Sequence, residues 1–347
     1  MTTHADAPTP IALPPCDDRI LWDAWLSLYH FPALAAADDL GLFALLRDEP
    51  ATAEDLARRL ALGPRATEAL LGVLAALGLL HQDGGLFALT DVARDFALPD
   101  GPFYWGPMLR LMRGVPITAD TVRDALRRDK PLVYDGQLPA IWETHELPPA
   151  QAQPFTAAMH SLSFPAAVGL ARSGAFAGVQ RLLDVAGGSG SVSIALARGQ
   201  PHLRCTVLEL PGVCRLADQY SAAYGVGGRV DTLAANMFTD AWPAGHDAVL
   251  FSNVFHDWSR AHCAHLARRA FDALPAGGRI YVHEVLLADT KDGPPPAALF
   301  SLNMILFAEG KQFTAGELGE VLTEAGFRGI AVTLAYGYYS LIRGHKP

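Results

Sequence analysis

A histidine followed by an aspartate, His256-Asp257, stands just after an apolar run, 246–252, that is typical of a buried strand. Imidazole has an ordinary pKa of about 6.5, so it is the side chain that most readily takes a proton from a substrate at neutral pH. Residues that follow a parallel strand lie at the sheet edge where α/β proteins bind ligands. We therefore predict that His256 is a general base. Two further histidines, His262 and His265, fall on the next helical stretch and are expected to face solvent.

A glycine-rich loop, Gly187-Gly188-Ser189-Gly190, follows another strand-like run and opens a helical stretch. Glycines let the backbone approach a ligand closely there, and the amides at the start of the helix face that ligand. Glu209 ends the next strand-like run, at a separation from the loop that fits a hydrogen bond to a ribose. Dinucleotide enzymes share both features, so the loop and the acid predict a nucleotide cofactor without choosing its class.

The elements that position these residues alternate between strand and helix from residue 180 onward. This alternation predicts an α/β domain with a parallel, doubly wound sheet that is covered on both faces. The tail differs, because runs 329–334 and 337–342 are joined by a short turn and must pair antiparallel. The five strands expected before the tail are 180–186, 204–209, 229–234, 246–252 and 279–285.

The N-terminal part is mainly helical. Apolar residues recur at helical spacing over 18–47, and Pro32 and Gly41 are expected to divide this stretch. Thr52 is predicted to cap a helix that runs to Leu62.

A second helix, 65–80, is followed by a predicted hairpin with its turn at Asp83-Gly84-Gly85, and Thr90 is expected to cap the helix after it. Two helices and a hairpin outline a winged helix, which raises the alternative of a transcription regulator. Residues 52–95, however, hold four arginines against six acidic residues, whereas a DNA-reading helix needs cations for phosphates. We therefore interpret this unit as an interaction module.

Composition limits the class of protein further. A chain of 347 residues suggests about two domains. Its net charge of -9 disfavours nucleic acid and anionic membranes as partners. Only 18% of the residues are charged, below the usual ~25%, which suggests that part of the surface is covered by another subunit. Four cysteines without a Cys-x-x-Cys pair, and no apolar leader or membrane-length run, predict a cytoplasmic protein without a zinc site.

The motifs together resemble one family, the plant-type and bacterial small-molecule O-methyltransferases, which includes the caffeate and acetylserotonin methyltransferases. The resemblance runs from about Asp18 to the C-terminus, and His-Asp-Trp is its most specific part. It is carried by Leu182 to Gly190, Leu208-Glu209-Leu210-Pro211, Asn236-Met237-Phe238, Phe255-His256-Asp257-Trp258 and Leu274-Pro275-Ala276-Gly277-Gly278.

This resemblance implies a class I fold that binds S-adenosylmethionine (SAM) and releases S-adenosylhomocysteine (SAH), with no metal. It also implies a homodimer, in which N-terminal helices of one subunit help to close the pocket of the other around a small aromatic substrate. The expected organisation is a disordered N-terminus (1–17), a winged-helix-like dimerisation domain (18–100), a helical linker with pocket residues (101–175) and a SAM-binding catalytic domain (176–347).

Site residues are carried over by position. Glu284 is implied as the carboxylate that orients His256, and Asp257 either helps to orient the pocket or caps the next helix. The implied cofactor contacts are Ser163, Asp184, Gly187, Gly188, Gly190, Glu209, Leu210, Asn236, Met237 and Ser252. The implied substrate contacts are Phe155, Met159, Trp258, Asn303, Met304, Phe307 and Gln312, several of them on a predicted helix over 295–308.

The sequence departs from the family pattern at several positions. Ala186 replaces a glycine, Glu209 and Asn236 each replace an aspartate, Ser252 stands where plant members often have lysine, and Gln312 replaces a second glutamate beside the base. Gln312 cannot carry charge, which leaves open whether oxygen or an electron-rich carbon, such as indole C3, receives the methyl group. We also considered metal-assisted methylation of a 2-oxo acid. The only histidine after His283 is His345 in the tail, so a third metal ligand is lacking. An inactive SAM-binding protein is a further alternative, which the intact His256 and Glu284 disfavour.

Overall fold

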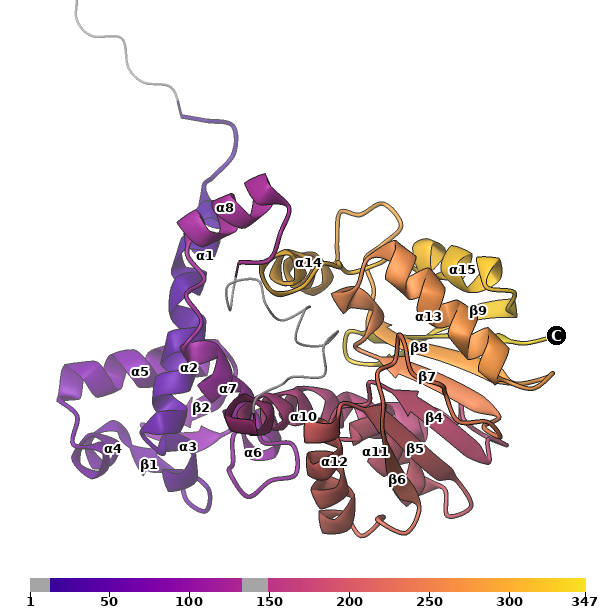
Figure 1. The fold of residues 1–347 in the computed structure, drawn as a ribbon. Helices are drawn as coiled ribbons and strands as arrows, with labels where there is room; N and C mark the ends of the chain where they lie inside the picture. The colour runs from indigo at the N-terminus through magenta and orange to yellow at the C-terminus, as the bar shows by residue number, and fades with distance from the viewer. Residues whose placement is uncertain (1–12, 133–148) are drawn as a thin grey trace, which may run out of the picture. The chain divides into compact units, whose positions relative to one another are not determined.

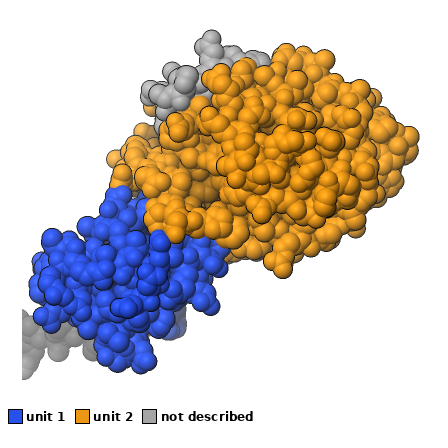
Figure 2. Space-filling view, turned by 90° about the horizontal axis from the view of Figure 1, so that it is seen from below, with its two compact units in different colours: residues 1–98 blue, residues 99–347 orange. Residues whose placement is uncertain are grey.

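The computed structural model describes residues 13–132 and 149–347, so most of the predicted N-terminal tail lies outside the described residues. The chain forms two compact units, residues 1–98 and 99–347 (Figure 2). Within the described ranges, no helix is both long and apolar enough to cross a membrane.

The first unit is helical with a small sheet. Its helices are α1 (Arg19–Leu26), η1 (Ser27–Tyr29), α2 (His30–Asp39), α3 (Leu42–Leu45), α4 (Ala53–Leu60), α5 (Pro64–Ala76) and α6 (Asp91–Phe96). Strands β1 (Ala51–Thr52), β2 (Leu80–Asp83) and β3 (Leu86–Leu89) pair in the order β1-β3-β2. Thr52 and Thr90 cap α4 and α6 as predicted, because each hydroxyl accepts a backbone N–H of the first turn.

Two helix boundaries in this unit differ from the prediction. Pro32 does not divide the first stretch, because it lies in the first turn of α2, where the missing N–H has no helical partner to lose. The break falls at η1 instead. The helix expected over 65–80 ends at Ala76, since Gly78 takes a left-handed conformation (φ 75°) and terminates it.

The second unit is built on a seven-stranded sheet of order β6-β5-β4-β7-β8-β10-β9 (Figure 1). Strands β4 to β8 are parallel, and β10 joins β8 and β9 antiparallel, as the sequence predicts. Their bounds are β4 (Arg181–Val185), β5 (Arg204–Glu209), β6 (Val230–Ala234), β7 (Ala248–Ser252), β8 (Arg279–Val285), β9 (Arg328–Tyr336) and β10 (Tyr339–His345).

Alternate residues of the central strands pack into two separate cores. Leu183, Val249 and Val282 face a core shared with α13 (Arg260–Ala273) and α15 (Ala315–Glu324). Leu182 and Leu250 face a second core with α10 (Pro149–Arg172) and α11 (Ser191–Gly199). This two-faced burial fixes the strand register, because a slip of one residue would exchange the two faces.

Further helices and a short 3₁₀ turn belong to this unit. They are α7 (Gly106–Arg113), α8 (Ala119–Arg128), α12 (Pro211–Ala223), the short 3₁₀ turn η3 (Phe255–Asp257) and α14 (Pro295–Phe307). α14 matches the helix predicted over 295–308, and η3 carries the predicted base.

Candidate active site

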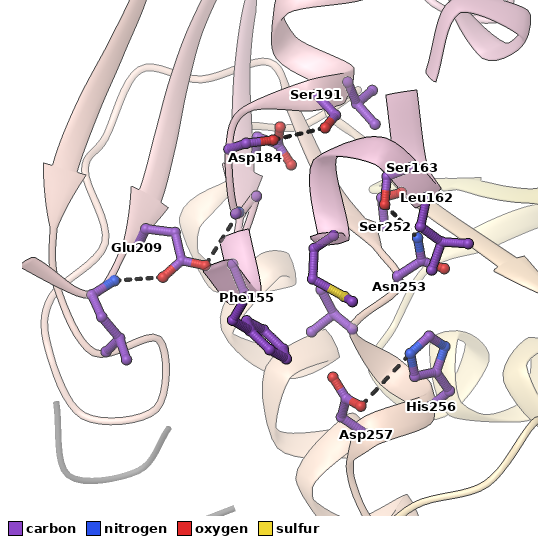
Figure 3. Close-up of a pocket in the computed structure, with 18 of the residues that line it drawn as sticks. Phe155, Leu162, Ser163, Asp184, Ser191, Glu209, Ser252, Asn253, His256 and Asp257 are labelled. Atoms are coloured by element: carbon purple, nitrogen blue, oxygen red, sulfur yellow. Dashed lines mark hydrogen bonds and ion pairs between the residues drawn. The ribbon is translucent and has the colours of Figure 1, made fainter. Parts of the chain in front are cut away.

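A cavity of about 240 Å³ opens at the carboxyl ends of β4, β5 and β7, entirely within the second unit (Figure 3). One half is lined by the loop after β4 and by the ends of β5 and β7, and the other half by helices α7, α10 and α14 together with η3. Most of the predicted contacts lie on its wall: Phe155, Met159, Ser163, Asp184, Gly187, Gly188, Glu209, Leu210, Met237, Ser252, His256, Asp257, Trp258, Asn303, Met304 and Phe307.

The loop after β4 approaches the cavity with its backbone. Gly188 (φ 59°) has the left-handed conformation that favours glycine, and a Cβ at Gly187 would lie 2.7 Å from Cγ of Asp184. Ala186 also has a left-handed backbone (φ 52°), so alanine is accommodated where the family pattern has glycine. Gly190 is not on the cavity wall. It caps the start of α11 (φ 75°), so its contribution is to the turn.

A buried carboxylate, Asp184, and a half-buried one, Glu209, flank this loop. Asp184 accepts a hydrogen bond from Ser193 Oγ at 2.7 Å through Oδ2, while Oδ1 is buried without a hydrogen-bond partner. Glu209 accepts from the Gly188 N–H at 3.2 Å and from the Leu210 N–H at 2.6 Å (Figure 3). Burial raises the pKa of Asp184 to about 6 and that of Glu209 to about 7. An open carboxylate oxygen beside a glycine cradle fits a ligand that carries ammonium and ribose hydroxyl groups, as SAM does.

The side chain of Asn236, a predicted cofactor contact, bonds to the backbone of its own turn. Its side-chain oxygen accepts a hydrogen bond from the Phe238 N–H at 2.8 Å, so it holds the turn after β6. Asn236 is buried and is not on the cavity wall, whereas the neighbouring Met237 is. The side-chain oxygen of Asn236 thus bonds within its own turn, and the adenine contact expected from Asn236 stays a prediction.

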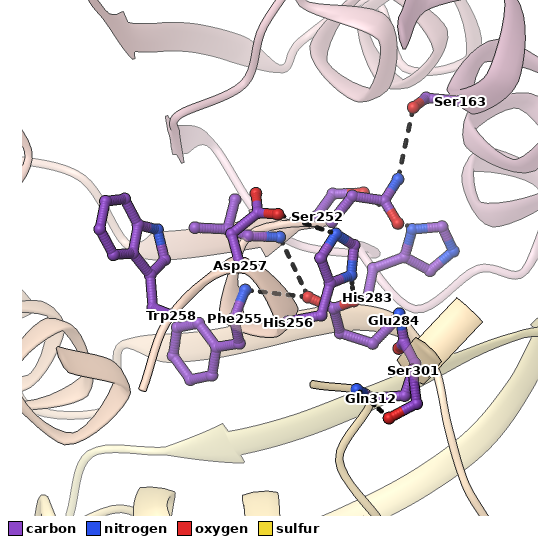
Figure 4. Close-up of polar contacts among 12 residues, drawn as sticks. Ser163, Ser252, Phe255, His256, Asp257, Trp258, His283, Glu284, Ser301 and Gln312 are labelled. Atoms are coloured by element: carbon purple, nitrogen blue, oxygen red, sulfur yellow. Dashed lines mark hydrogen bonds and ion pairs between the residues drawn. The ribbon is translucent and has the colours of Figure 1, made fainter. Parts of the chain in front are cut away.

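The predicted base and its orienting carboxylate meet as expected. His256 Nδ1 lies 2.6 Å from Glu284 Oε2, and the other oxygen of Glu284 accepts from the N–H groups of Val254 and Phe255, each at 3.0 Å (Figure 4). Both side chains are buried, at 5% and 1% exposure. With Nδ1 donating to Glu284, Nε2 is left as a proton acceptor beside the cavity.

The charge state of His256 is set by its carboxylate neighbours. Burial lowers its pKa, but Glu284 and Asp257 outweigh burial and raise that pKa to about 9. Asp257 lies on the cavity wall with Oδ1 3.7 Å from His256 Nε2, and burial raises its pKa to about 7. The alternative role for Asp257 as a helix cap is wrong, because Ser259 caps α13 by accepting the His262 N–H.

Replacing Asp257 with asparagine removes one of the carboxylates that hold the pKa of His256 up. A base must lose its proton before it can accept another, so kcat/KM rises with pH through the pKa of His256 in the free enzyme. We expect the rising limb of the pH–kcat/KM profile of D257N to shift to lower pH than in the wild type. The control is Glu309→Gln, whose carboxylate contacts His262 away from the cavity wall. A D257N limb that stays with the E309Q limb would contradict this electrostatic role.

Gln312 does not occupy its expected place. The side chain is fully buried, it is not on the cavity wall, and neither amide atom has a hydrogen-bond partner. Its backbone N–H donates to Ser301 Oγ at 3.3 Å (Figure 4). The substrate contact expected from Gln312 stays a prediction, and Glu284 is the carboxylate within hydrogen-bond distance of His256 Nδ1.

Gly310 holds the catalytic turn by close approach. Its N–H donates to the Asp257 carbonyl at 3.1 Å, and a Cβ would collide with the His256 carbonyl and lie 2.6 Å from the Trp258 nitrogen. We expect Gly310→Ala to displace η3 and lower kcat by about tenfold to a hundredfold, because small misplacements of a reacting group are costly. Gly199→Ala, which meets no atom within 4 Å, is the control. Wild-type kcat in G310A would show that the turn tolerates the displacement.

Sequence reasoning missed several wall residues. Asn253 follows β7 with a left-handed backbone (φ 56°), and its Nδ2 donates to Ser163 Oγ at 3.3 Å. An asparagine after a strand was the available signal, since Asn adopts this conformation more readily than most residues. The other missed wall residues include Met108, Leu111, Met112, Leu162 and Ser191.

The fold and the site define a class of protein. A parallel sheet with an antiparallel C-terminal hairpin, a glycine-rich loop after β4 and an acid at the end of β5 form the SAM-dependent methyltransferase domain. The family model of the O-methyltransferase domain matches residues 119–328, and that of the O-methyltransferase dimerisation domain matches residues 22–98. The chain belongs to this O-methyltransferase family, and its winged-helix-like unit matches the family's dimerisation domain.

Known proteins resemble the chain over most of its length. It is 38% identical over 312 residues to the 3-hydroxy-5-methyl-1-naphthoate 3-O-methyltransferase of Streptomyces sahachiroi, covering 88% of each chain. It is 30% identical to the L-tyrosine C(3)-methyltransferase of Streptomyces lavendulae, covering 86% of this chain and 83% of that one. The structure of PigF with SAH superposes with a TM-score of 0.76 at 28% identity, covering 95% and 100% of the two chains. The protein is thus a SAM-dependent methyltransferase.

Proposed function

We propose that this enzyme transfers the methyl group of SAM to a hydroxyl oxygen of a small aromatic metabolite, with His256 as general base. The observation that carries the proposal is the buried His256–Glu284 pair, 2.6 Å apart, on the wall of the cavity. Aromatic and thioether side chains line the half of the cavity formed by α7, α10, α14 and η3, where we expect the acceptor to bind, and they suit a flat apolar ring. They are Met108, Met112, Phe155, Met159, Phe300, Met304 and Phe307.

The cofactor supplies an electrophilic methyl group, and the protein orients the reactants, excludes water and provides a base. Asp184 and Glu209 hold the polar parts of the cofactor, and the apolar wall keeps water away from the acceptor. His256 Nε2 accepts the phenolic proton as oxygen attacks, and Glu284 stabilises the resulting imidazolium through Nδ1–H. Asp257 adds negative charge on the cavity side of the ring.

A carbon acceptor is the second candidate. The relative from Streptomyces lavendulae is named for methylation at C(3) of tyrosine, a ring carbon next to the phenol oxygen. Removal of a phenolic or indolic proton raises the electron density of such a ring carbon as well as that of the heteroatom, so the same base would serve both reactions. The orientation of the ring in the cavity then decides which atom faces the methyl group.

A product assay tests the proposal. The enzyme is incubated with SAM and a panel of phenols, hydroxynaphthalenes, hydroxyindoles and 3-substituted indoles, and fragmentation by mass spectrometry locates the added methyl group. A methyl group on oxygen is the expected result. A methyl group on ring carbon would replace this proposal with the second candidate, and a methyl group found only on the aliphatic side chains of these compounds would overturn both.

We also propose a homodimer, assembled through the first unit. The match to a dimerisation domain supports it, as do exposed apolar side chains on α1 and η1. Light scattering is expected to give twice the chain mass, and charged substitutions at Trp22 and Trp25 are expected to lower it. A monomer at micromolar concentration would contradict this assembly.

The cytoplasmic location, and the exclusion of nucleic acid and membranes as partners, stay predictions from the sequence.

A further inference from the structure

His160 is a buried histidine that the proposed chemistry does not use. It lies next to the half of the cavity formed by the loop after β4 and the ends of β5 and β7, which is called the cofactor half below. It stands on α10 directly after Met159, which is on the cavity wall, and only 7% of its surface is exposed. Burial lowers its pKa to about 4, so the ring is neutral at physiological pH. A neutral imidazole has one N–H donor and one acceptor nitrogen, and both ring nitrogens of His160 have hydroxyl partners.

The Nδ1 side of this ring contacts the cofactor loop. Nδ1 lies 2.8 Å from Ser189 Oγ and 3.3 Å from Ser191 Oγ, and the two serine oxygens are 2.8 Å apart. Both serines are buried and lie on the cavity wall, Ser189 in the glycine-rich loop and Ser191 at the start of α11. This triangle of contacts joins the loop to α10.

The other side of the ring is fixed by α12 and by α10 itself. Nε2 lies 3.3 Å from the Tyr224 hydroxyl. The ring is stacked between Phe164, at a centroid distance of 4.8 Å, and Tyr220, at 4.1 Å. Stacking against these two aromatic rings sets the ring plane of His160, so its hydrogen bonds hold the serine hydroxyls in one arrangement.

We propose that His160 is a positioning residue for the cofactor, acting through Ser189 and Ser191 to hold the glycine-rich loop in its binding conformation. The loop carries three glycines, whose backbone freedom would otherwise have to be lost on binding. α10 also carries Ser163, and Ser163 receives the hydrogen bond from Asn253 at the end of β7. His160 and Ser163 therefore connect one helix to both sides of the cofactor half.

Amide replacements separate the two sides of the ring. In H160N the side-chain amide lies near the position of Nδ1 and can still reach Ser189, whereas in H160Q it lies near Nε2 and reaches Tyr224. H160F keeps the stacked ring and removes both hydrogen bonds. We expect the Kd for SAH, measured by calorimetry without an acceptor, to rise about tenfold in H160F and H160Q and less in H160N, since one buried hydrogen bond contributes about that factor.

Further measurements distinguish positioning from general support of the fold. The melting temperature without ligand is recorded for each variant, and KM for SAM is expected to rise while kcat at saturating SAM stays close to wild type. S189A is expected to raise the Kd for SAH, and adding H160F to it should cost little more, because both remove the same link. The control H246F replaces a buried histidine that contacts Thr206 and is not on the cavity wall.

Wild-type Kd values for SAH in H160F and H160Q would overturn the proposal. So would losses of affinity that follow the melting temperatures of all variants, H246F included, because that pattern indicates a structural histidine. If H160F does not fold, the comparison of H160N with H160Q decides. The proposal depends on the SAM-binding class and not on the aromatic acceptor, so binding of SAH tests it even if the product assay finds another acceptor.

Discussion

Replacing His256 with alanine is expected to lower kcat by about 10²- to 10⁴-fold while SAM affinity is kept, the range usual for loss of a general base. The reason is geometric, because Nδ1 of His256 contacts Glu284, which leaves Nε2 as the ring nitrogen that can accept the substrate's proton once the ring is deprotonated. The measurements are single-turnover rates and calorimetry with SAH.

The control for this variant is His202→Ala, which changes an exposed histidine outside the cavity wall. Loss of SAH binding in H256A would show that the residue is structural. Full activity in H256A would remove it from the mechanism. Activity that recovers when imidazole is added to H256A would support the assignment further, because a free base can then occupy the space left by the ring.

Replacing Glu284 with glutamine is expected to lower kcat by about 10²- to 10⁴-fold through the tautomer of His256. The amide oxygen can accept the N–H groups of Val254 and Phe255, as Oε1 does now. The amide NH₂ then faces Nδ1 and donates to it, so the proton of the neutral ring moves to Nε2. A protonated Nε2 cannot accept a proton from the substrate.

The same substitution makes a prediction about pH. Glu284 raises the pKa of His256, so E284Q is expected to lower that pKa and shift the rising limb of its residual activity to lower pH. E284A is the comparison variant, because alanine has neither the carboxylate nor an amide that could donate a hydrogen bond to His256 Nδ1. If E284Q keeps wild-type kcat and an unshifted pH profile, Glu284 neither orients nor charges the ring.

The sequence predicts the sheet and most of the cavity wall because these depend on local signals. Alternating apolar runs place β4, β5, β7 and β8 within two residues of their observed bounds, and the residues after a parallel strand reach one edge. Glu284 was found through the family spacing. The structure adds the physical reason, a contact of 2.6 Å between η3, which follows β7, and the neighbouring strand β8.

The features that the sequence did not predict depend on contacts far apart in the chain. The Asn236 side-chain oxygen accepts the Phe238 N–H of its own turn, and Gln312 is buried and is not on the cavity wall, although the family pattern suggests ligand contacts for both. α7 contributes Met108 and Met112 to the wall although its residues carry no motif. His160 joins α10 to the glycine-rich loop, a contact between residues 29 positions apart that no short pattern encodes.

The dependence of the His256→Ala defect on the acidity of the acceptor tests the central claim most directly. Wild-type and H256A rates are compared for one acceptor and for a nitro-substituted analogue acidic enough to be ionised at the assay pH. If His256 removes the acceptor's proton, the ionised analogue does not need it, so the defect should shrink by at least tenfold. An equal defect for both acceptors would contradict the role of His256 as a base and leave it only a part in positioning.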